Sequence, residues 1–437
     1  MATLHIGNNR TTEMAGDLTA LGPVERLASG CGAQRALWFA EDGDVLVLPR
    51  ALDADYVRYV TTLTGVRSQS LRIIAPAPGY AGPDLLTEDR LADPALRHEV
   101  RGALDGRAPQ RVFAFYPDAS VVALARSLGA ESAVPGHAFL AQGGSASANS
   151  KAVFRAIAAG IGIPIAEGAV AGTRQEAHDA ITALLDAGHP AIVKLEFQSG
   201  SYGNEILSPT GGLEPYGARR VEVLPDAAAV REYLERRWDW LTGGGRLRLV
   251  VERYYVGARP VYAEFLVDDH GVRYTGQGEL LMAPVFDGVV IPVPGLAPDE
   301  LGVLVDSCRS LCEAFRAFGY RGTMSVDGFL TRDGEVLLNE TNSRVSGSTH
   351  LHDVIGPRII GRPHVGRRVM FERGGWAVPS FGAAAGLLSD SGLAYDPDTR
   401  TGIILICDFT SVDGTVRYCV VAENITAARE VERKLLS

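Results

Sequence analysis

Short apolar runs alternate with helical stretches over the first third of the chain. The pattern predicts strands at residues 3–6, 36–40, 45–48, 71–75 and 111–116, and a helix at 120–128. Such alternation is typical of a small α/β layer domain. This part of the chain contains neither a Gly-x-Gly-x-x-Gly nor a Walker-type loop, so it offers no motif for a nucleotide.

A small, polar stretch at residues 141–150 predicts a linker, or an ordered loop into a helix. We therefore expect a first domain at 1–142 and a second, with mixed strands and helices, at 143–373. The tail has Gly-, Pro- and Ser-rich connections, a hairpin at 402–422 and a charged terminal helix. It indicates a small third domain at 374–437, so that an α/β domain is followed by α+β domains.

The segment 322–344 reads as a β-hairpin with Asp333-Gly334 as its turn. A two-residue loop at this point would, counting outward, place Asp327 directly opposite Glu340. Two carboxylates would then share one face of the sheet, with their Cβ atoms about 5 Å apart. This arrangement is destabilising unless a cation or a proton lies between them.

Asn342 follows Glu340 by two residues and therefore lies on the same face of the predicted strand. Oxygen atoms of Asp, Glu and Asn are the ligands that Mg²⁺ prefers, and Mg²⁺ usually leaves its other positions to water and nucleotide phosphates. The segment predicts a magnesium site of a nucleotide-dependent enzyme. A solvated hairpin with ordinary surface acids explains the segment equally well.

Lys194 lies in the centre of an apolar strand predicted at 191–197, and a loop of small residues, 198–204, follows it. The backbone N–H groups of such a loop are able to close over phosphates. Taken alone, the pattern also fits an amphipathic strand with a snorkelling lysine and a surface loop. Lys151 opens a helix predicted at 151–160, where a cation opposes the helix dipole unless it faces an anion.

Two acids occupy the polar sides of apolar strands, Glu252 in the strand at 248–256 and Glu264 in the strand at 261–267. Either carboxylate could accept hydrogen bonds from a nucleobase amine or from ribose hydroxyls. Either could equally be an acid at a sheet edge.

Composition narrows the classes of function. The net charge of −10 argues against a nucleic-acid partner, because phosphate binding needs a basic face. No apolar run is long enough to span a membrane and residues 1–10 lack a secretory pattern, so we expect a cytoplasmic protein. The five cysteines show no framework spacing, and Cys308 and Cys312 are expected to pack in a helix core.

The order of these residues resembles the ATP-grasp superfamily, in which two α+β subdomains clamp ATP between sheets. The resemblance covers roughly residues 143–365, and the preceding domain looks like a pre-ATP-grasp domain. Residues 5–13, 322–344, the Ser346-Gly-Ser-Thr-His350 continuation and the small C-terminal domain look more closely like the pheganomycin-type peptide ligases.

The resemblance implies a role for each candidate residue. Lys151 and Lys194 would contact ATP phosphates, and Arg344 would stabilise the transferring phosphoryl group or the acyl phosphate. The other implied roles are a phosphate-covering loop of Ser199, Gly200, Ser201 and Gly203, adenine binding by Glu252 and Tyr255 with the neighbouring backbone, ribose binding by Glu264, and Mg²⁺ binding by Asp327, Glu340 and Asn342.

Two features depart from the family pattern: the loop is Ser-Gly-Ser-Tyr-Gly, where Gly-Gly is frequent, and Ser343 stands where Pro is common. These departures bear on the exact residues of the loop and on the substrate pocket. For His350 and His352, a place at the carboxylate site and a capping or core role are both open.

The implied function is ATP-dependent formation of a peptide bond through an acyl phosphate, with release of ADP and phosphate. An amino acid would supply the carboxylate and a peptide would supply its N-terminal amine, as in antibiotic biosynthesis. The alternatives are a ligase for small metabolites and a catalytically silent ATP-binding regulator. Biotin carboxylation is disfavoured because the chain has no Met-Lys-Met. A homodimer is compatible with the sequence.

Overall fold

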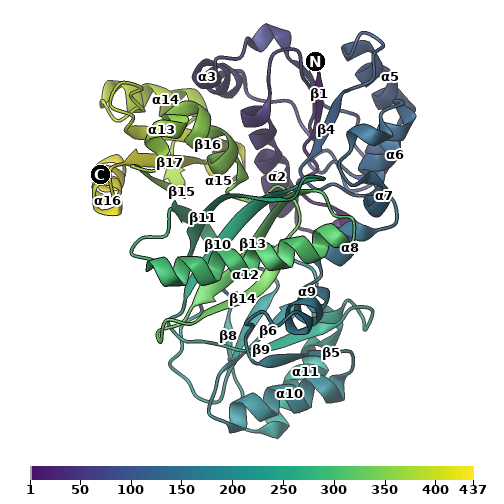
Figure 1. Ribbon diagram of the computed structural model, residues 1–437, viewed down its shortest axis with the longest axis vertical. Helices are drawn as coiled ribbons and strands as arrows, with labels where there is room; N and C mark the ends of the chain where they lie inside the picture. The colour runs from purple at the N-terminus through teal and green to yellow at the C-terminus, as the bar shows by residue number, and fades with distance from the viewer. Residues whose placement is uncertain (1) are drawn as a thin grey trace.

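Four parallel strands form the sheet of the N-terminal domain in the computed structural model, which describes residues 2–437. Their order is β3-β2-β1-β4, with bounds β1 Thr3–Ile6, β2 Val45–Val47, β3 Arg72–Ile74 and β4 Arg111–Ala114. The main helices of this domain are α2 Pro23–Gly32, α3 Ala54–Thr64, α5 Pro94–Ala103 and α6 Ala119–Ser127 (Figure 1). Shorter elements are α1 Thr12–Ala15, η1 Leu18–Ala20, η3 Ser68–Ser70, α4 Glu88–Ala92 and η4 Glu131–Ala133.

Two predictions for this region are wrong. The strand predicted at 36–40 is part of η2, the 3₁₀-helix Ala33–Phe39 that directly continues α2. The run is apolar because it is buried from several sides, and the hydrophobic pattern of such a short run does not distinguish a strand from a helix. The predicted linker at 141–150 contains a helix, α8 Gly144–Asn149, which follows α7 His137–Leu140.

A five-stranded sheet forms the second unit, in the order β5-β9-β6-β7-β8. Its strands are β5 Gly168–Ala171, β6 Ala191–Leu195, β7 Asn204–Ser208, β8 Val221–Val223 and β9 Leu249–Arg253. The helices α10 Arg174–Asp186 and α11 Ala227–Thr242 contribute to its apolar core and lie at the end of the molecule remote from the N-terminal domain (Figure 1). The helix α9 Lys151–Gly160 begins where the sequence predicts it, and the Ser150 hydroxyl caps it by accepting from Val153 N.

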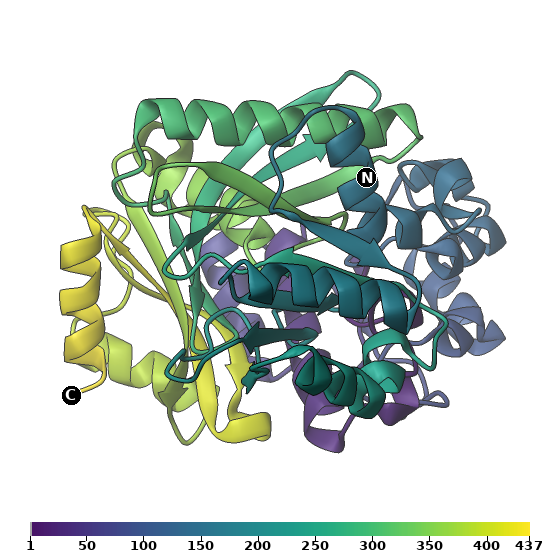
Figure 2. The same cartoon turned by 90° about the horizontal axis from the view of Figure 1, so that it is seen from below.

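The largest sheet has eight strands in the order β14-β13-β10-β11-β12-β15-β17-β16. The strands are β10 Arg259–Val267, β11 Val272–Met282, β12 Phe286–Ile291, β13 Gly322–Leu330, β14 Val336–Asn342, β15 Val369–Ala377, β16 Gly402–Phe409 and β17 Thr415–Ala422. The long helix α12 Pro298–Ala317 runs across one side of this sheet (Figure 2). Its Cys308 and Cys312 are fully buried in the core beneath it, as predicted.

The C-terminal segment extends the large sheet, because β15 pairs with β12 on one edge and with β17 on the other. The boundary predicted at residue 373 therefore falls inside β15. The remaining helices are η5, a π-helix at Leu351–Gly361, α13 Arg362–Val365, α14 Phe381–Asp390, α15 Thr410–Asp413 and α16 Ile425–Leu435. Both overall views place α16 on the opposite side of the molecule from α5 and α6.

The hairpin of β13 and β14 brings Asp327 directly opposite Glu340, which confirms the pairing predicted from the sequence. The two-residue loop on which that prediction was based is wrong, because Thr331 N donates to Glu335 O across a three-residue turn. A β-bulge leaves Asn339 unpaired and restores the register. Without this extra residue, Asp327 would face Asn339.

Candidate active site

A cavity of about 300 Å³ lies where the N-terminal domain, the five-stranded sheet and the large sheet meet. Its lining includes charged side chains, Lys194, Asp327, Glu340 and Arg344, together with aromatic rings. The aromatic residues that line it are Tyr216, Tyr254, Tyr255, Tyr262, Phe286 and Phe329.

Asp327 and Glu340 form the acidic part of this cavity. The Asp327 carboxylate accepts hydrogen bonds from Ser325 Oγ at 3.1 Å and from Asn342 Nδ2 at 2.8 Å. Burial, followed by the negative charge of Glu340, raises the pKa of Asp327. The carboxylates of Asp327 and Glu340 and the amide of Asn342 therefore lie together, as predicted. The repulsion between the two carboxylates favours a cation there.

Two lysines, Lys151 and Lys194, lie next to this acidic pair. The chain contains only one other lysine, Lys434. Lys151 Nζ lies 3.0 Å from Glu340 Oε2 and donates to Gln198 O at 2.9 Å. Burial opposes ionisation of Glu340, but the positive charges of Lys151 and Lys194 lower its pKa. Lys151 thus joins the acidic strand to the loop that follows β6, and its contact with a phosphate stays a prediction.

Lys194 is buried, with 5% of its side chain exposed, and its Nζ lies 2.5 Å from Glu252 Oε2. The other oxygen of Glu252 accepts from Arg155 Nη1 at 2.5 Å. A snorkelling lysine is therefore excluded. Glu252 also lines the cavity, with both of its oxygens engaged by cations and 1% of its side chain exposed, so its contact with adenine stays a prediction. Glu252 holds Lys194 at the cavity.

The loop after β6 covers the cavity through Ser199, Gly200 and Ser201, which line it as predicted. Gly200 and Ser201 both have φ of +65°, a conformation that favours glycine at position 200. Gly200 O accepts from Phe286 N at 3.3 Å, so the loop reaches across to β12. Gly203 does not line the cavity; its carbonyl accepts from Leu195 N and closes the base of the loop.

Tyr255 is one of the aromatic residues that line the cavity, and its contact with the cofactor stays a prediction. Its ring lies 5.3 Å from the ring of Phe329, and the guanidinium of Arg253 lies 4.8 Å from its centroid. Aromatic faces of this kind stack on other flat rings.

Glu264 does not reach the cavity, so its predicted contact with ribose is wrong. The side chain is fully buried and accepts from Ser346 Oγ at 2.6 Å and from Thr349 Oγ1 at 2.9 Å. Burial, together with the charge of Asp353, raises the pKa of Glu264 to about 7. Alternation along β10 correctly gave its face of the sheet, but that face is covered by residues 346–349 at this point.

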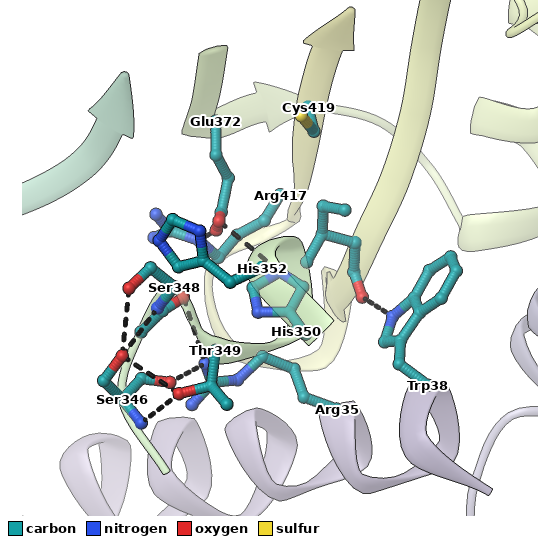
Figure 3. A network of polar contacts seen from close by, with 12 residues as sticks. Arg35, Trp38, Ser346, Ser348, Thr349, His350, His352, Glu372, Arg417 and Cys419 are labelled. Atoms are coloured by element: carbon teal, nitrogen blue, oxygen red, sulfur yellow. Dashed lines mark hydrogen bonds and ion pairs between the residues drawn. The ribbon is translucent and has the colours of Figure 1, made fainter. Parts of the chain in front are cut away.

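Residues 346–349 are also held from the N-terminal domain (Figure 3). Arg35 Nη1 donates to Ser346 O at 3.0 Å and to Gly347 O at 3.3 Å, and both of these residues line the cavity. No pattern in the sequence indicated Arg35. It joins the N-terminal domain to the wall of the site.

His350 and His352 lie behind this wall and do not line the cavity (Figure 3). His350 Nε2 lies 3.5 Å from Glu372, which pairs with Arg417 at 3.0 Å, and burial holds the pKa of His350 well below its usual value. His352 Nε2 lies 2.9 Å from Tyr262 Oη, and burial lowers its pKa to about 4. Of the two predicted roles, the core role is therefore the one observed.

Arg344 lines the cavity beside the acidic pair. Its Nη1 donates to Asn149 Oδ1 at 2.8 Å, and the same oxygen accepts from Ser343 N at 3.0 Å. Asn149 Nδ2 in turn donates to Ser145 O within α8. Asn149 thus holds Arg344, the arginine that the resemblance places at the transferring phosphoryl group.

Comparisons with known proteins agree with this architecture. Residues 33–130 match the family model of the Pre ATP-grasp domain, and residues 383–435 match that of the PGM1 C-terminal domain. A search of curated proteins found no match.

Solved structures resemble the whole chain. An ADP complex of N5-carboxyaminoimidazole ribonucleotide synthetase superposes with a TM-score of 0.58 at 12% identity, covering 99% of this chain and 96% of that one. The fold is the ATP-grasp fold. The same synthetase from Thermus thermophilus gives 0.56 at 14% identity over 100% and 97% of the two chains. Biotin carboxylase from Campylobacter jejuni gives 0.57 at 12% identity over 98% and 88%.

The predicted fold class is thus confirmed, with a pre-ATP-grasp domain, an ATP-grasp domain and a small C-terminal part. Among residues 2–437, no helix combines the length and the apolar character that a membrane span requires.

Removing the charge of Lys194 tests whether this buried lysine binds a phosphate. In Lys194→Met, Glu252 keeps Arg155 as a partner, so the fold should persist with a modest loss of stability. The affinity for a non-hydrolysable ATP analogue, measured by calorimetry, should fall by at least about tenfold, which corresponds to about 1.4 kcal/mol. Lys434→Met, at the exposed end of α16, is the matched control. Equal affinities in both variants would exclude a phosphate contact.

The repulsion between Asp327 and Glu340 should appear in the pH dependence of stability without metal. The folded state retains a proton on Asp327 above the ordinary pKa of 3.8, so the free energy of unfolding should fall as pH rises above 4. Asp327→Asn should make this slope shallower than in wild type, and it should hold or raise the melting temperature in EDTA. Glu264, whose pKa is also raised, contributes a remaining slope of the same sign. Asp306→Asn, on the exposed side of α12, is the control. A slope as steep in Asp327→Asn as in wild type would contradict the assignment.

Proposed function

We propose that the protein is an ATP-dependent carboxylate–amine ligase that joins the carboxylate of an amino acid to the N-terminal amine of a peptide. The observation that carries the proposal is the cavity in which Asp327, Glu340 and Asn342 converge beside Lys194 and Arg344. The ATP-grasp fold supports an activity that uses ATP. The finer assignment to peptide ligation rests on the sequence resemblance.

The residues present fit a magnesium nucleotide. Asp327 and Glu340 lie opposite each other, and a 180° turn of the Asn342 amide would present its oxygen to the same point. In the part of the chain that the structure describes, no group of three or more His, Cys, Asp or Glu side chains could hold a metal. A metal at Asp327 and Glu340 would therefore share its coordination with phosphate oxygens, as Mg²⁺ commonly does.

The bond changes are simple. A carboxylate oxygen of one substrate attacks the γ-phosphorus of ATP and the bond to ADP breaks, which gives an acyl phosphate. The amine nitrogen of the second substrate then attacks the acyl carbon, phosphate leaves with the bonding electrons and the nitrogen loses a proton. Bound Mg²⁺ would offset negative charge on the phosphates during the first step.

The protein's own groups position these reactants. Lys194, fixed by Glu252, and Arg344, fixed by Asn149, present positive charge to the transferring phosphoryl group. The loop 198–203 closes over the cavity and keeps water from the acyl phosphate. No side chain needs to act as a nucleophile.

Product analysis tests the proposed reaction. The enzyme is given ATP with a pool of amino acids and short peptides, and the products are identified by mass spectrometry. ADP and phosphate should form in a one-to-one ratio with the amide. Acetylating the N-terminus of the peptide should stop product formation, because the attacking amine is lost. Lengthening the peptide at its C-terminus should be tolerated.

Other outcomes would identify other functions. Turnover with small amines alone would favour a ligase for small metabolites. Release of AMP and pyrophosphate would indicate adenylation. ATP binding without turnover of any pair would support a catalytically silent regulator.

A further inference from the structure

Arg35 is a half-buried cation that lines the cavity and has no acidic partner. It belongs to η2 of the N-terminal domain, and its side chain leaves that helix toward residues 346–349 (Figure 3). Within residues 2–437, the guanidinium donates to three backbone carbonyls and forms no ion pair with a carboxylate. Carbonyl oxygens offset part of the cost of burying a charge, and an anion would offset the rest.

The guanidinium also keeps one nitrogen for a ligand. Nε donates to Gly32 O at 3.3 Å, and Nη1 makes the two contacts with the carbonyls of Ser346 and Gly347. Nη2 has no hydrogen-bond partner within residues 2–437, and it is not buried. Because Arg35 lines the cavity, Nη2 is available to a ligand that occupies it.

Contacts of Arg35 and Phe115 fix the residues that directly follow Arg344. Residues 344–347 form a continuous part of the cavity lining. Phe115 O accepts from Val345 N at 3.0 Å, and the Arg35 guanidinium lies 5.6 Å from the centroid of the Phe115 ring. Arg35 and Arg344 therefore belong to the same wall of the cavity.

Three arginines line the cavity, Arg35, Arg253 and Arg344. None of them pairs with a carboxylate in the part of the chain that the structure describes. Arg253 lies in the five-stranded sheet against the ring of Tyr255, whereas Arg35 and Arg344 share the wall formed by residues 344–347. This wall thus carries two positive charges that the protein does not neutralise.

We propose that Arg35 is a substrate-binding residue that, together with Arg344, receives the carboxylate of the acyl donor at the wall formed by residues 344–347. The identity of the anion as a carboxylate that is later phosphorylated rests on the proposed function. The geometry itself specifies a small oxyanion, because guanidinium N–H groups match carboxylate and phosphate oxygens. The γ-phosphate of ATP has the same chemistry, and the experiment below distinguishes the two sources.

Two substitutions separate anion binding from support of the wall. Arg35→Gln removes the positive charge, whereas Arg35→Lys keeps the charge but loses the planar guanidinium that reaches both carbonyls. If Arg35 only braced the wall, both variants would be impaired alike. Arg26→Gln is the matched control, because Arg26 lies on α2, also donates to a backbone carbonyl, that of Ala81, and does not line the cavity.

Acetate is the probe for the anion site. It is added to the complex of the protein with Mg²⁺ and a non-hydrolysable ATP analogue, in which the nucleotide supplies its own γ-phosphate. Thermal shift with acetate is compared with chloride at equal ionic strength, since a ligand of the folded state raises the melting temperature. Acetate should stabilise wild type and Arg26→Gln, bind Arg35→Gln with at least about tenfold lower affinity, and bind Arg35→Lys with intermediate affinity. Melting temperatures without ligands show whether each variant is folded.

Trapping with hydroxylamine adds a kinetic measurement that needs no knowledge of the amine substrate. Hydroxylamine attacks the acyl carbon of an acyl phosphate and phosphate leaves, so a pool of amino acids should give a hydroxamate. In Arg35→Gln the KM for the active carboxylate should rise at least about tenfold, while the KM for ATP changes less than about threefold. Arg35→Lys should recover part of the loss.

The outcomes separate the two proposals. If wild type gives no hydroxamate but acetate binding depends on Arg35, the anion site stands and the ligase function fails. The Arg35 proposal is overturned if acetate does not stabilise wild type, or if it stabilises Arg35→Gln and Arg26→Gln equally. It is overturned as well if Arg35→Gln and Arg35→Lys are equally impaired, because Arg35 would then only brace the wall. A loss of affinity for the ATP analogue with acetate binding unchanged would assign Arg35 to the γ-phosphate instead.

Discussion

The site is organised around the unfavourable approach of two carboxylates. The large sheet holds Asp327 opposite Glu340, and the bulge at Asn339 supplies the residue that makes this register possible. A carboxylate pair of this kind destabilises the folded chain unless charge is supplied. The protein supplies part of it through Lys151 on one side, while burial and the charge of Glu340 raise the pKa of Asp327. A divalent cation that brings nucleotide phosphates with it would complete the balance.

Three parts of the chain contribute to this one cavity. The N-terminal domain sends Arg10 to the loop 198–203 and Arg35 to the segment 346–349. The five-stranded sheet supplies Lys194, which Glu252 holds in place, and the C-terminal strands extend the sheet that carries the acidic pair. The walls of the cavity are thus fixed by different parts of the chain.

Much of the site could be predicted from local sequence patterns, because strand alternation and hairpin pairing depend on neighbouring residues. That logic found Asp327, Glu340, Asn342 and Lys194, although the loop count behind the hairpin was wrong and the bulge compensated for it. The resemblance, and not this logic, gave Glu252 an adenine contact and Glu264 a ribose contact. Alternation could not test either contact, since it gives the face of a strand but not what packs on that face. In the folded chain, Arg155 of α9 and the segment 346–349 cover them. The pairing of β15 with β12, and the contacts of Arg10 and Arg35, join residues far apart in sequence, and no local pattern encodes them.

The central claim is that the acidic pair binds a divalent cation together with a nucleotide. Electron paramagnetic resonance of Mn²⁺ tests it directly, with ADP carrying ¹⁷O on its β-phosphate. The account predicts weak Mn²⁺ binding to the free protein, much tighter binding with ADP, and broadening of the bound Mn²⁺ lines by the ¹⁷O label, because the metal would share its coordination with the phosphate. Mn²⁺ binding that is indifferent to ADP, or bound lines that the label does not broaden, would contradict it.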